Sequence, residues 1–143
     1  MESKSPIEKM KKVAEDKHLS EAPAHTFMSK QVLSITAGTR IYFAVKMLQT
    51  HRISGAPVVD NSGHLIGIIS DYDLLLQAAT RDVSSPLEYR HDVLAIDLDT
   101  PLKEVIVHLY RTKYRRLPVV DKTRKVVGVV SRIDVLMKLL GLP

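Results

Sequence analysis

The hydrophobic positions of the chain follow one order twice. From residue 32 to residue 80, a short apolar run is followed by an amphipathic stretch, then by two apolar runs on either side of a turn, and then by a second amphipathic stretch. Short apolar runs bounded by turn residues predict buried strands, and apolar residues three and four positions apart predict the buried face of a helix. The pattern therefore predicts a β-α-β-β-α unit, and residues 93–140 repeat it.

The expected strands and helices fall at matching places in the two copies. We expect helices to begin after Thr39 and Thr100, whose hydroxyls can accept hydrogen bonds from the first backbone amides of a helix, and after Ser70 and Ser131. The expected strands are Val32–Ile35, Ala56–Asp60 and Leu65–Ile69 in the first copy, and Val93–Ile96, Leu117–Asp121 and Val126–Val130 in the second.

The two copies align without a gap at an offset of 61 residues. Residues 55–75 match the second copy well, with Pro57 on Pro118. The hairpin turns are an exception, because Gly63 suits a positive φ angle whereas Arg124, at the matching place, does not. We therefore expect the second turn to differ from the first.

A unit of about 60 residues buries too little surface to be stable alone, whereas two packed copies reach the core of an ordinary domain. The sequence thus predicts a mixed α/β (α+β) fold in which two β-α-β-β-α repeats pack as a pseudo-twofold pair. We expect residues 1–23 to form an N-terminal helical extension, 24–80 the first repeat, 81–91 a linker and 92–143 the second repeat.

Two helical segments carry further signals. Ser5-Pro6-Ile7-Glu8 is a capping box with proline at the first helical position, and it predicts a helix through about Lys17. The closing helix of the first repeat holds Leu74, Leu75 and Leu76 in succession, which one small sheet cannot cover. Because the second repeat closes on a similarly apolar helix, we expect a second burial partner, supplied by the other unit and by a second copy of the chain in a homodimer.

Composition narrows the class of protein. The 143 residues are 45% hydrophobic and 26% charged, with no cysteine, no apolar run of membrane-spanning length and no apolar leader at the N-terminus. This composition predicts a cytoplasmic globular protein without disulfides or thiolate metal sites. The net charge of +5 is concentrated in residues 81–143, which hold twelve basic and eight acidic side chains. That surplus is either a solvated basic face or a binding region for an anionic ligand.

The pattern Ser-x-x-Asp recurs as Ser70-x-x-Asp73 and Ser131-x-x-Asp134. It is a capping box, in which the hydroxyl and the carboxylate bond the free amides of a helix start. The same geometry places a hydroxyl, a carboxylate and a helix N-terminus together. Backbone amides and the helix dipole favour the binding of a phosphate group, and a carboxylate can accept hydrogen bonds from both hydroxyls of a ribose 2′,3′-diol. Both interpretations stay open from the residues alone.

These motifs resemble the CBS domain, named after cystathionine β-synthase. The resemblance lies in Gly55–Asp60 followed by Gly67–Leu74, and again in Arg115–Asp121 followed by Gly128–Asp134, and it covers about residues 24–140. It is greatest to CBS pairs that have no attached enzyme or transporter. The resemblance implies a regulatory sensor that binds AMP, ADP or ATP, or else S-adenosylmethionine or a dinucleotide, changes its pair or dimer geometry, and acts on a separate partner protein.

The resemblance also assigns roles to residues. Asp73 and Asp134 would hold ribose, Ser70 and Ser131 would lie near ribose or phosphate, and the adenine would lie against the segments that precede the prolines. Arg115, Arg116 and Arg132 are candidates for phosphate, because guanidinium groups bond phosphate oxygens bidentately; they could equally be surface charges. The candidate residues are Ser34, Thr36, Ile53, Ser54, Gly55, Ala56, Pro57, Ser70, Asp73, Tyr114, Arg115, Arg116, Leu117, Pro118, Ser131, Arg132 and Asp134.

The copies differ in their first strands, where such pairs often carry a hydroxyl. Ser34 occupies that place in the first copy and Ala95 in the second. Since each cleft of such a pair takes residues from both repeats, Ser34 can serve the cleft that holds Asp134. We expect that cleft, with the basic surplus nearby, to be the better site.

The sequence also bears on three other functions. The fold could serve dimerisation without any ligand, and the positive charge could serve nucleic acid, although aromatic residues for base stacking are few at 5%. An enzyme is not expected, because the chain has no HExxH, Walker A or GxGxxG sequence. Glu104 and His108 lie four apart, but such a pair is more often a surface contact than a metal site. We expect no required cofactor, no metal and no membrane partner.

Overall fold

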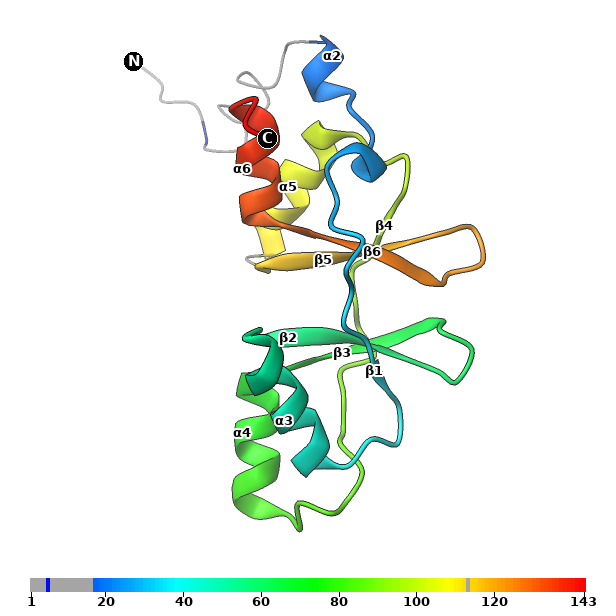
Figure 1. Ribbon diagram of the computed structural model, residues 1–143, viewed down its shortest axis with the longest axis vertical. Coiled ribbons are helices and arrows are strands. Elements are labelled where there is room, and N and C mark those ends of the chain that lie inside the picture. Colours follow the sequence, from blue (N-terminus) through cyan, green and yellow to red (C-terminus); the bar gives the residue numbers. More distant parts are fainter. Residues whose placement is uncertain (1–4, 6–16, 113) are drawn as a thin grey trace. The chain divides into compact units, whose positions relative to one another are not determined.

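The computed structural model describes residue 5, residues 17–112 and residues 114–143 (Figure 1). Most of the predicted N-terminal helix lies outside the described residues; one helical turn, α2, spans Lys17–Ser20. The chain forms two compact units. The Asp73 unit comprises residues 33–94 and 123–126, and the Asp134 unit comprises residues 1–32, 95–122 and 127–143.

The Asp73 unit is a three-stranded sheet with two helices on one side (Figure 1). Its elements are β1 (Ile35–Thr36), α3 (Ile41–His51), β2 (Gly55–Val59), β3 (Leu65–Ser70) and α4 (Asp71–Thr80). Strand β1 pairs parallel with β2, and β2 pairs antiparallel with β3. Ile35, Val58 and Ile69 from the strands are fully buried in one core with Ile41 and Leu74 from the helices.

The Asp134 unit repeats this arrangement. Its elements are α2, η1 (Ala24–Thr26), β4 (Ile96–Asp97), α5 (Leu102–Thr112), β5 (Arg116–Val120), β6 (Val126–Ser131) and α6 (Arg132–Leu139). The strand order is β4-β5-β6, with β4 parallel to β5. Leu102, Val105 and Val119 are fully buried. The predicted fold class, with two β-α-β-β-α repeats, is confirmed, as are the starts of the closing helices directly after Ser70 and Ser131.

The expected caps at Thr39 and Thr100 are wrong. Helix α3 has Arg40 at its N-cap without a side-chain cap, and its first two amides, of Ile41 and Tyr42, donate to the carbonyls of Ser85 and Val83, both at 3.0 Å. The Thr39 hydroxyl instead donates to the Thr36 carbonyl at 2.7 Å, and Thr100 Oγ1 accepts from the Asp97 amide at 2.9 Å. In both copies the threonine therefore closes the loop after a strand of only two residues, because the nearby strand end offers the hydroxyl a closer partner than the helix does.

The expectation that the two hairpin turns differ is wrong. Gly63 has φ +87° and Arg124 has φ +67°. Both copies thus use a positive φ angle at the same position, because a short hairpin connection must match the right-handed twist of its strands. Arg124 adopts this conformation at a cost that glycine would not incur.

Each sheet is extended by the segment that precedes the other copy in sequence. In the Asp73 unit, Arg90 exchanges two backbone hydrogen bonds with Ile68, both at 2.9 Å. In the Asp134 unit, Ser29 does the same with Val129, at 2.8 and 2.9 Å. The two pairs are related by the same 61-residue offset. Residues 24–32 thus pack with the second copy, while the predicted domain boundaries stay a prediction.

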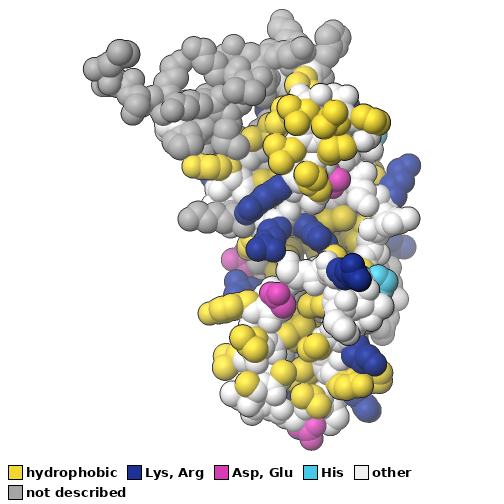
Figure 2. Space-filling view, turned by 60° about the vertical axis from the view of Figure 1, so that its left-hand side comes forward, with side chains coloured by type: hydrophobic (Ala, Val, Ile, Leu, Met, Phe, Trp, Pro, Cys, Tyr) yellow, Lys and Arg dark blue, Asp and Glu magenta, His cyan; other side chains and the backbone are white. Residues whose placement is uncertain are grey.

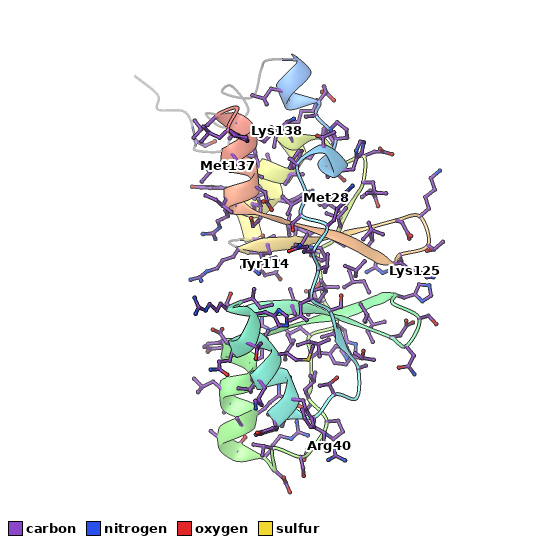
Figure 3. All side chains as sticks on the ribbon, in the orientation of Figure 1. Met28, Arg40, Tyr114, Lys125, Met137 and Lys138 are labelled. Carbon is purple, nitrogen blue, oxygen red and sulfur yellow. The ribbon has the colours of Figure 1, made fainter. Side chains whose placement is uncertain are left out.

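Both copies have glycine at the matching positions 67 and 128, because the segment that extends each sheet crosses directly over it. We call these the lead-in segments: Tyr89 and Arg90 in the Asp73 unit, and Met28 and Ser29 in the Asp134 unit. A Cβ atom at Gly67 would lie 2.5 Å from the Arg90 carbonyl oxygen and against the Tyr89 ring. A Cβ atom at Gly128 would lie 2.5 Å from the sulfur of Met28, which Figure 3 labels. The glycines are therefore required for close approach.

Within the described residues, no helix has the length and apolar character to cross a bilayer.

Two matched helix N-termini as the candidate functional site

In each unit, the start of the middle strand lies beside the N-terminus of the closing helix. Within the Asp73 unit, Gly55 pairs with Ser70 across the β2–β3 ladder, and the Asp71 amide donates to the Ser54 carbonyl at 2.8 Å. In the Asp134 unit, the Arg132 amide donates to the Arg115 carbonyl at 3.1 Å. An antiparallel hairpin imposes this proximity, since the first residue of one strand faces the last residue of the other.

The structure thus brings the predicted adenine segment and the Ser-x-x-Asp pair together within each unit. The Asp73 unit holds Ser34, Thr36, Ile53, Ser54, Gly55, Ala56, Pro57, Ser70 and Asp73, and the Asp134 unit holds Tyr114, Arg115, Arg116, Leu117, Pro118, Ser131, Arg132 and Asp134. Four of these side chains are buried and pack in the core of their unit: Ala56, Pro57, Leu117 and Pro118.

At the N-terminus of α6, the predicted capping box is complete. The Asp134 amide donates to Ser131 Oγ at 3.2 Å, and Asp134 Oδ2 accepts from the Ser131 amide at 2.9 Å. Among the described residues, no group donates to the other oxygen, Asp134 Oδ1. The half-buried carboxylate therefore keeps one oxygen available to a ligand while the other holds the helix start.

At the N-terminus of α4, the predicted capping box is only half formed. The Asp73 amide donates to Ser70 Oγ at 3.2 Å, but the carboxylate does not return the bond to the Ser70 amide. Asp73 Oδ2 accepts from the Ser70 hydroxyl at 2.9 Å, and Oδ1 accepts from Nε and Nη2 of Arg90 at 3.1 and 3.0 Å. The carboxylate thus bonds the guanidinium group and the Ser70 hydroxyl in place of the Ser70 amide, so the expectation of a capping box at both helix starts is wrong for α4.

Arg90 is the residue of this site that the sequence interpretation missed. It lies in the predicted linker, and its alignment with Ser29 becomes informative only when both are seen to pair with a sheet. Its side chain is 56% exposed, and that of Asp73 is 18% exposed.

The two helix starts also differ in charge. The first turn of α4 carries Asp71 and Asp73, whereas α6 begins with Arg132 and has Asp134 as its acidic residue. Arg132 Nε donates to the carbonyl of Tyr114, which lies two residues before β5 (Figure 3), at 3.2 Å. An anion at the α6 start therefore meets basic side chains and helix amides, while at the α4 start it meets an additional carboxylate.

Asp60, which belongs to the repeated motif, serves the hairpin turn. Its Oδ1 accepts from the amides of His64 and Ser62, both at 2.9 Å, and these bonds lower the pKa of its carboxyl, the His64 amide most strongly. The motif thus contains a structural carboxylate besides the candidate ligand-binding one. The described residues contain no group of three His, Asp or Glu side chains that could hold a metal ion.

Comparison with known proteins agrees with the resemblance to CBS domains. The model of the CBS domain family matches residues 24–79 and 82–141. A CBS domain-containing protein of Dictyostelium discoideum is 32% identical over 123 residues, which cover 76% of this chain and 85% of that protein. The chain spans 41%, 22% and 38% of the length of three longer curated relatives from Methanocaldococcus jannaschii.

Two similar solved structures contain adenosyl ligands. The structure of CBSX2 in complex with AMP, a protein of Arabidopsis thaliana, has a TM-score of 0.71 and 29% identity and covers 83% of this chain and 96% of that one. The CBS domain pair of protein MJ0100, in complex with 5′-methylthioadenosine and S-adenosyl-L-methionine, has a TM-score of 0.70 and 28% identity and covers 84% and 96%.

Proposed function

The chain belongs to the CBS domain family, and on that premise we propose that it is a non-catalytic sensor that binds an adenine nucleotide, with Asp134 as its ribose-binding residue. AMP, ADP and ATP are the preferred ligands, and S-adenosylmethionine is the next candidate. Adenosyl compounds bind both of the similar solved proteins. The location in the cytoplasm stays a prediction.

The observation that carries this proposal is the available oxygen of Asp134 beside a basic helix start. A ribose diol needs a hydrogen-bond acceptor, and Asp134 Oδ1 has no donor among the described residues. A phosphate needs cations and the positive end of a helix dipole, and Arg115 and Arg132 flank the N-terminus of α6. Tyr114, which is partly buried and precedes Arg115 in the chain, would stack against the purine.

The test is a calorimetric titration with AMP, ADP, ATP and S-adenosylmethionine on the wild type and on Asp134→Asn. The amide oxygen of asparagine can still accept from the Ser131 amide, so the cap is kept while the charge and the second acceptor are lost. Hydrogen bonds to charged groups contribute about 1.5–3 kcal/mol, so we expect the affinity to fall by about 10- to 150-fold. Asp73→Asn is the matched control. Equal affinity of the wild type and Asp134→Asn would refute the assignment.

We further propose that the chain acts as a homodimer through its closing helices. In α4, Tyr72, Leu75 and Leu76 are 75%, 70% and 68% exposed. The matching face of α6 exposes Ile133 at 61% and Leu136 at 50%. Figure 2 shows hydrophobic side chains gathered over the helices of each unit. Two similar apolar faces suit the self-complementary contact of a twofold dimer, in which each patch meets a copy of itself or of its repeat.

Ligand binding would act by changing the geometry of the pair or of the dimer, and a separate effector protein would detect the change. The strength of such coupling equals the difference in ligand affinity between the two geometries. Sedimentation velocity and sedimentation equilibrium with and without AMP test this proposal: we expect a dimer whose sedimentation coefficient or dissociation constant changes with AMP. A monomer in both conditions would refute it.

A further inference from the structure

We propose that Arg90 determines which of the two matched carboxylates accepts a ribose: it occupies Asp73 and so leaves Asp134 as the preferred site. This inference rests on the proposed function and adds to it an asymmetry between the two sites. Arg90 lies outside the Ser-x-x-Asp motif and acts here as a specificity-determining residue.

The contacts of Asp73 leave little room for a diol. Oδ1 accepts two hydrogen bonds from one guanidinium group, at 3.1 and 3.0 Å, and Oδ2 accepts from the Ser70 hydroxyl at 2.9 Å. A ribose could bind only by displacing the guanidinium group. Breaking these charge-assisted bonds, in part exposed to water, should reduce the affinity by about tenfold relative to an open carboxylate.

The backbone fixes the position of Arg90. Its amide and carbonyl form the pair with Ile68 at 2.9 Å each, and the preceding Tyr89 packs directly over Gly67. The edge of the sheet thus holds the lead-in segment at a place from which the Arg90 side chain reaches Asp73. An arginine so placed loses less conformational freedom on pairing than one on a free loop.

The matching position in the Asp134 unit is Ser29. It pairs with Val129 in the register in which Arg90 pairs with Ile68. Serine carries no charge, and among the described residues no cation contacts Asp134. One residue difference at a matched position of the repeat therefore separates an occupied carboxylate from an available one.

Two exchange variants test the inference. Arg90→Ser gives the Asp73 unit the residue of its counterpart, and Ser29→Arg gives the Asp134 unit the cation it lacks. Binding is measured by calorimetric titration with AMP and with 5′-methylthioadenosine, which carries the ribose diol without a phosphate and so avoids repulsion by Asp71. Lys46→Ser, on the exposed face of α3, removes the same charge from the same unit and is the control.

We expect one strong site in the wild type and in Lys46→Ser, and two in Arg90→Ser, with affinity at the new site raised about tenfold. The added site should disappear in Arg90→Ser/Asp73→Asn. Ser29→Arg should weaken AMP binding by about tenfold. An unchanged number of sites in Arg90→Ser, or a loss of binding there, would overturn the inference while leaving the proposed function intact, as would two equal sites in the wild type. Absence of binding in the wild type and all variants would reject the proposed function together with the inference.

Discussion

Substituting alanine for the two matched glycines should affect stability unequally. Neither glycine has a positive φ angle, so the difference between the two substitutions depends on the space that the new methyl group meets. At Gly67 the methyl group meets backbone, the Arg90 carbonyl oxygen at 2.5 Å, and the Tyr89 ring. At Gly128 it meets mainly the flexible end of Met28, at 2.5 Å to the sulfur, while the Ser29 carbonyl oxygen lies farther away, at 3.1 Å.

The magnitude follows from what must move. Gly67→Ala has to displace the lead-in segment, which breaks the two Arg90–Ile68 backbone bonds at about 1 kcal/mol each and disturbs Tyr89 packing by about 1–2 kcal/mol. These losses sum to about 3–4 kcal/mol, and alanine offsets up to about 1 kcal/mol of them by reducing the entropy of the unfolded chain, so the free energy of unfolding should fall by about 2–4 kcal/mol. Gly128→Ala requires only a rotamer change of Met28 and should cost about 1 kcal/mol, because alanine also reduces the entropy of the unfolded chain.

The assay is urea unfolding of both variants and the wild type, followed by far-ultraviolet circular dichroism. Gly67→Ala should have the lower midpoint by a margin outside error. A neutral Gly67→Ala, or a Gly128→Ala that is the more destabilised of the two, would refute the reasoning that the lead-in segments cross directly over these glycines.

Three further predictions concern the turns and the helix faces. Arg124→Gly should raise the free energy of unfolding by about 0.5–1 kcal/mol and Gly63→Ala should lower it by about 1 kcal/mol, since both positions have positive φ angles; urea unfolding with the opposite signs would contradict this. The native pKa of Asp60 lies below its ordinary value of 3.8, so its contribution to stability is present above pH 3.8 and is lost as the pH falls through the lower native pKa. Asp60→Asn should therefore lose less of its free energy of unfolding than the wild type across that acid range. Equal losses in the two proteins, measured by urea unfolding at each pH, would count against the role of Asp60 in the turn. Leu76→Glu should dissociate the dimer in sedimentation equilibrium without loss of folding, because this side chain is 68% exposed, whereas Leu74→Ala should cost about 2–5 kcal/mol; a variant Leu76→Glu that stays dimeric would place the contact elsewhere.

Most of the regular elements could be predicted because the repeat provides two independent versions of each. The first strands are the exception, since they were expected at Val32–Ile35 and Val93–Ile96 and are Ile35–Thr36 and Ile96–Asp97. Ser70 and Ser131 both precede an apolar stripe, and each does cap its helix. Thr39 and Thr100 offered the same signal, but a carbonyl or amide only three residues away took their hydroxyls. Local sequence shows that a hydroxyl is available, and it does not show which of several nearby backbone groups will be bonded.

Each lead-in segment pairs with the sheet of the copy that it does not precede in sequence. This pairing could not be predicted, because its hydrogen bonds join residues far apart in sequence. Ser29 and Arg90 share neither side-chain type nor hydropathy, so the repeat is not detectable there from the residues. Arg90 consequently appeared as one charge in a linker, and the inequality of Asp73 and Asp134 was expected from the first-strand hydroxyl of Ser34 and from the basic surplus. The ion pair that distinguishes the two carboxylates depends on strand pairing.

The most direct measurement is a crystal structure of the protein grown with AMP. The account predicts one nucleotide per chain, with a ribose hydroxyl bonded to Asp134 Oδ1 and with Arg90 still on Asp73. A nucleotide on Asp73 with Asp134 empty, or crystals without AMP at a concentration that saturates CBSX2, would contradict it.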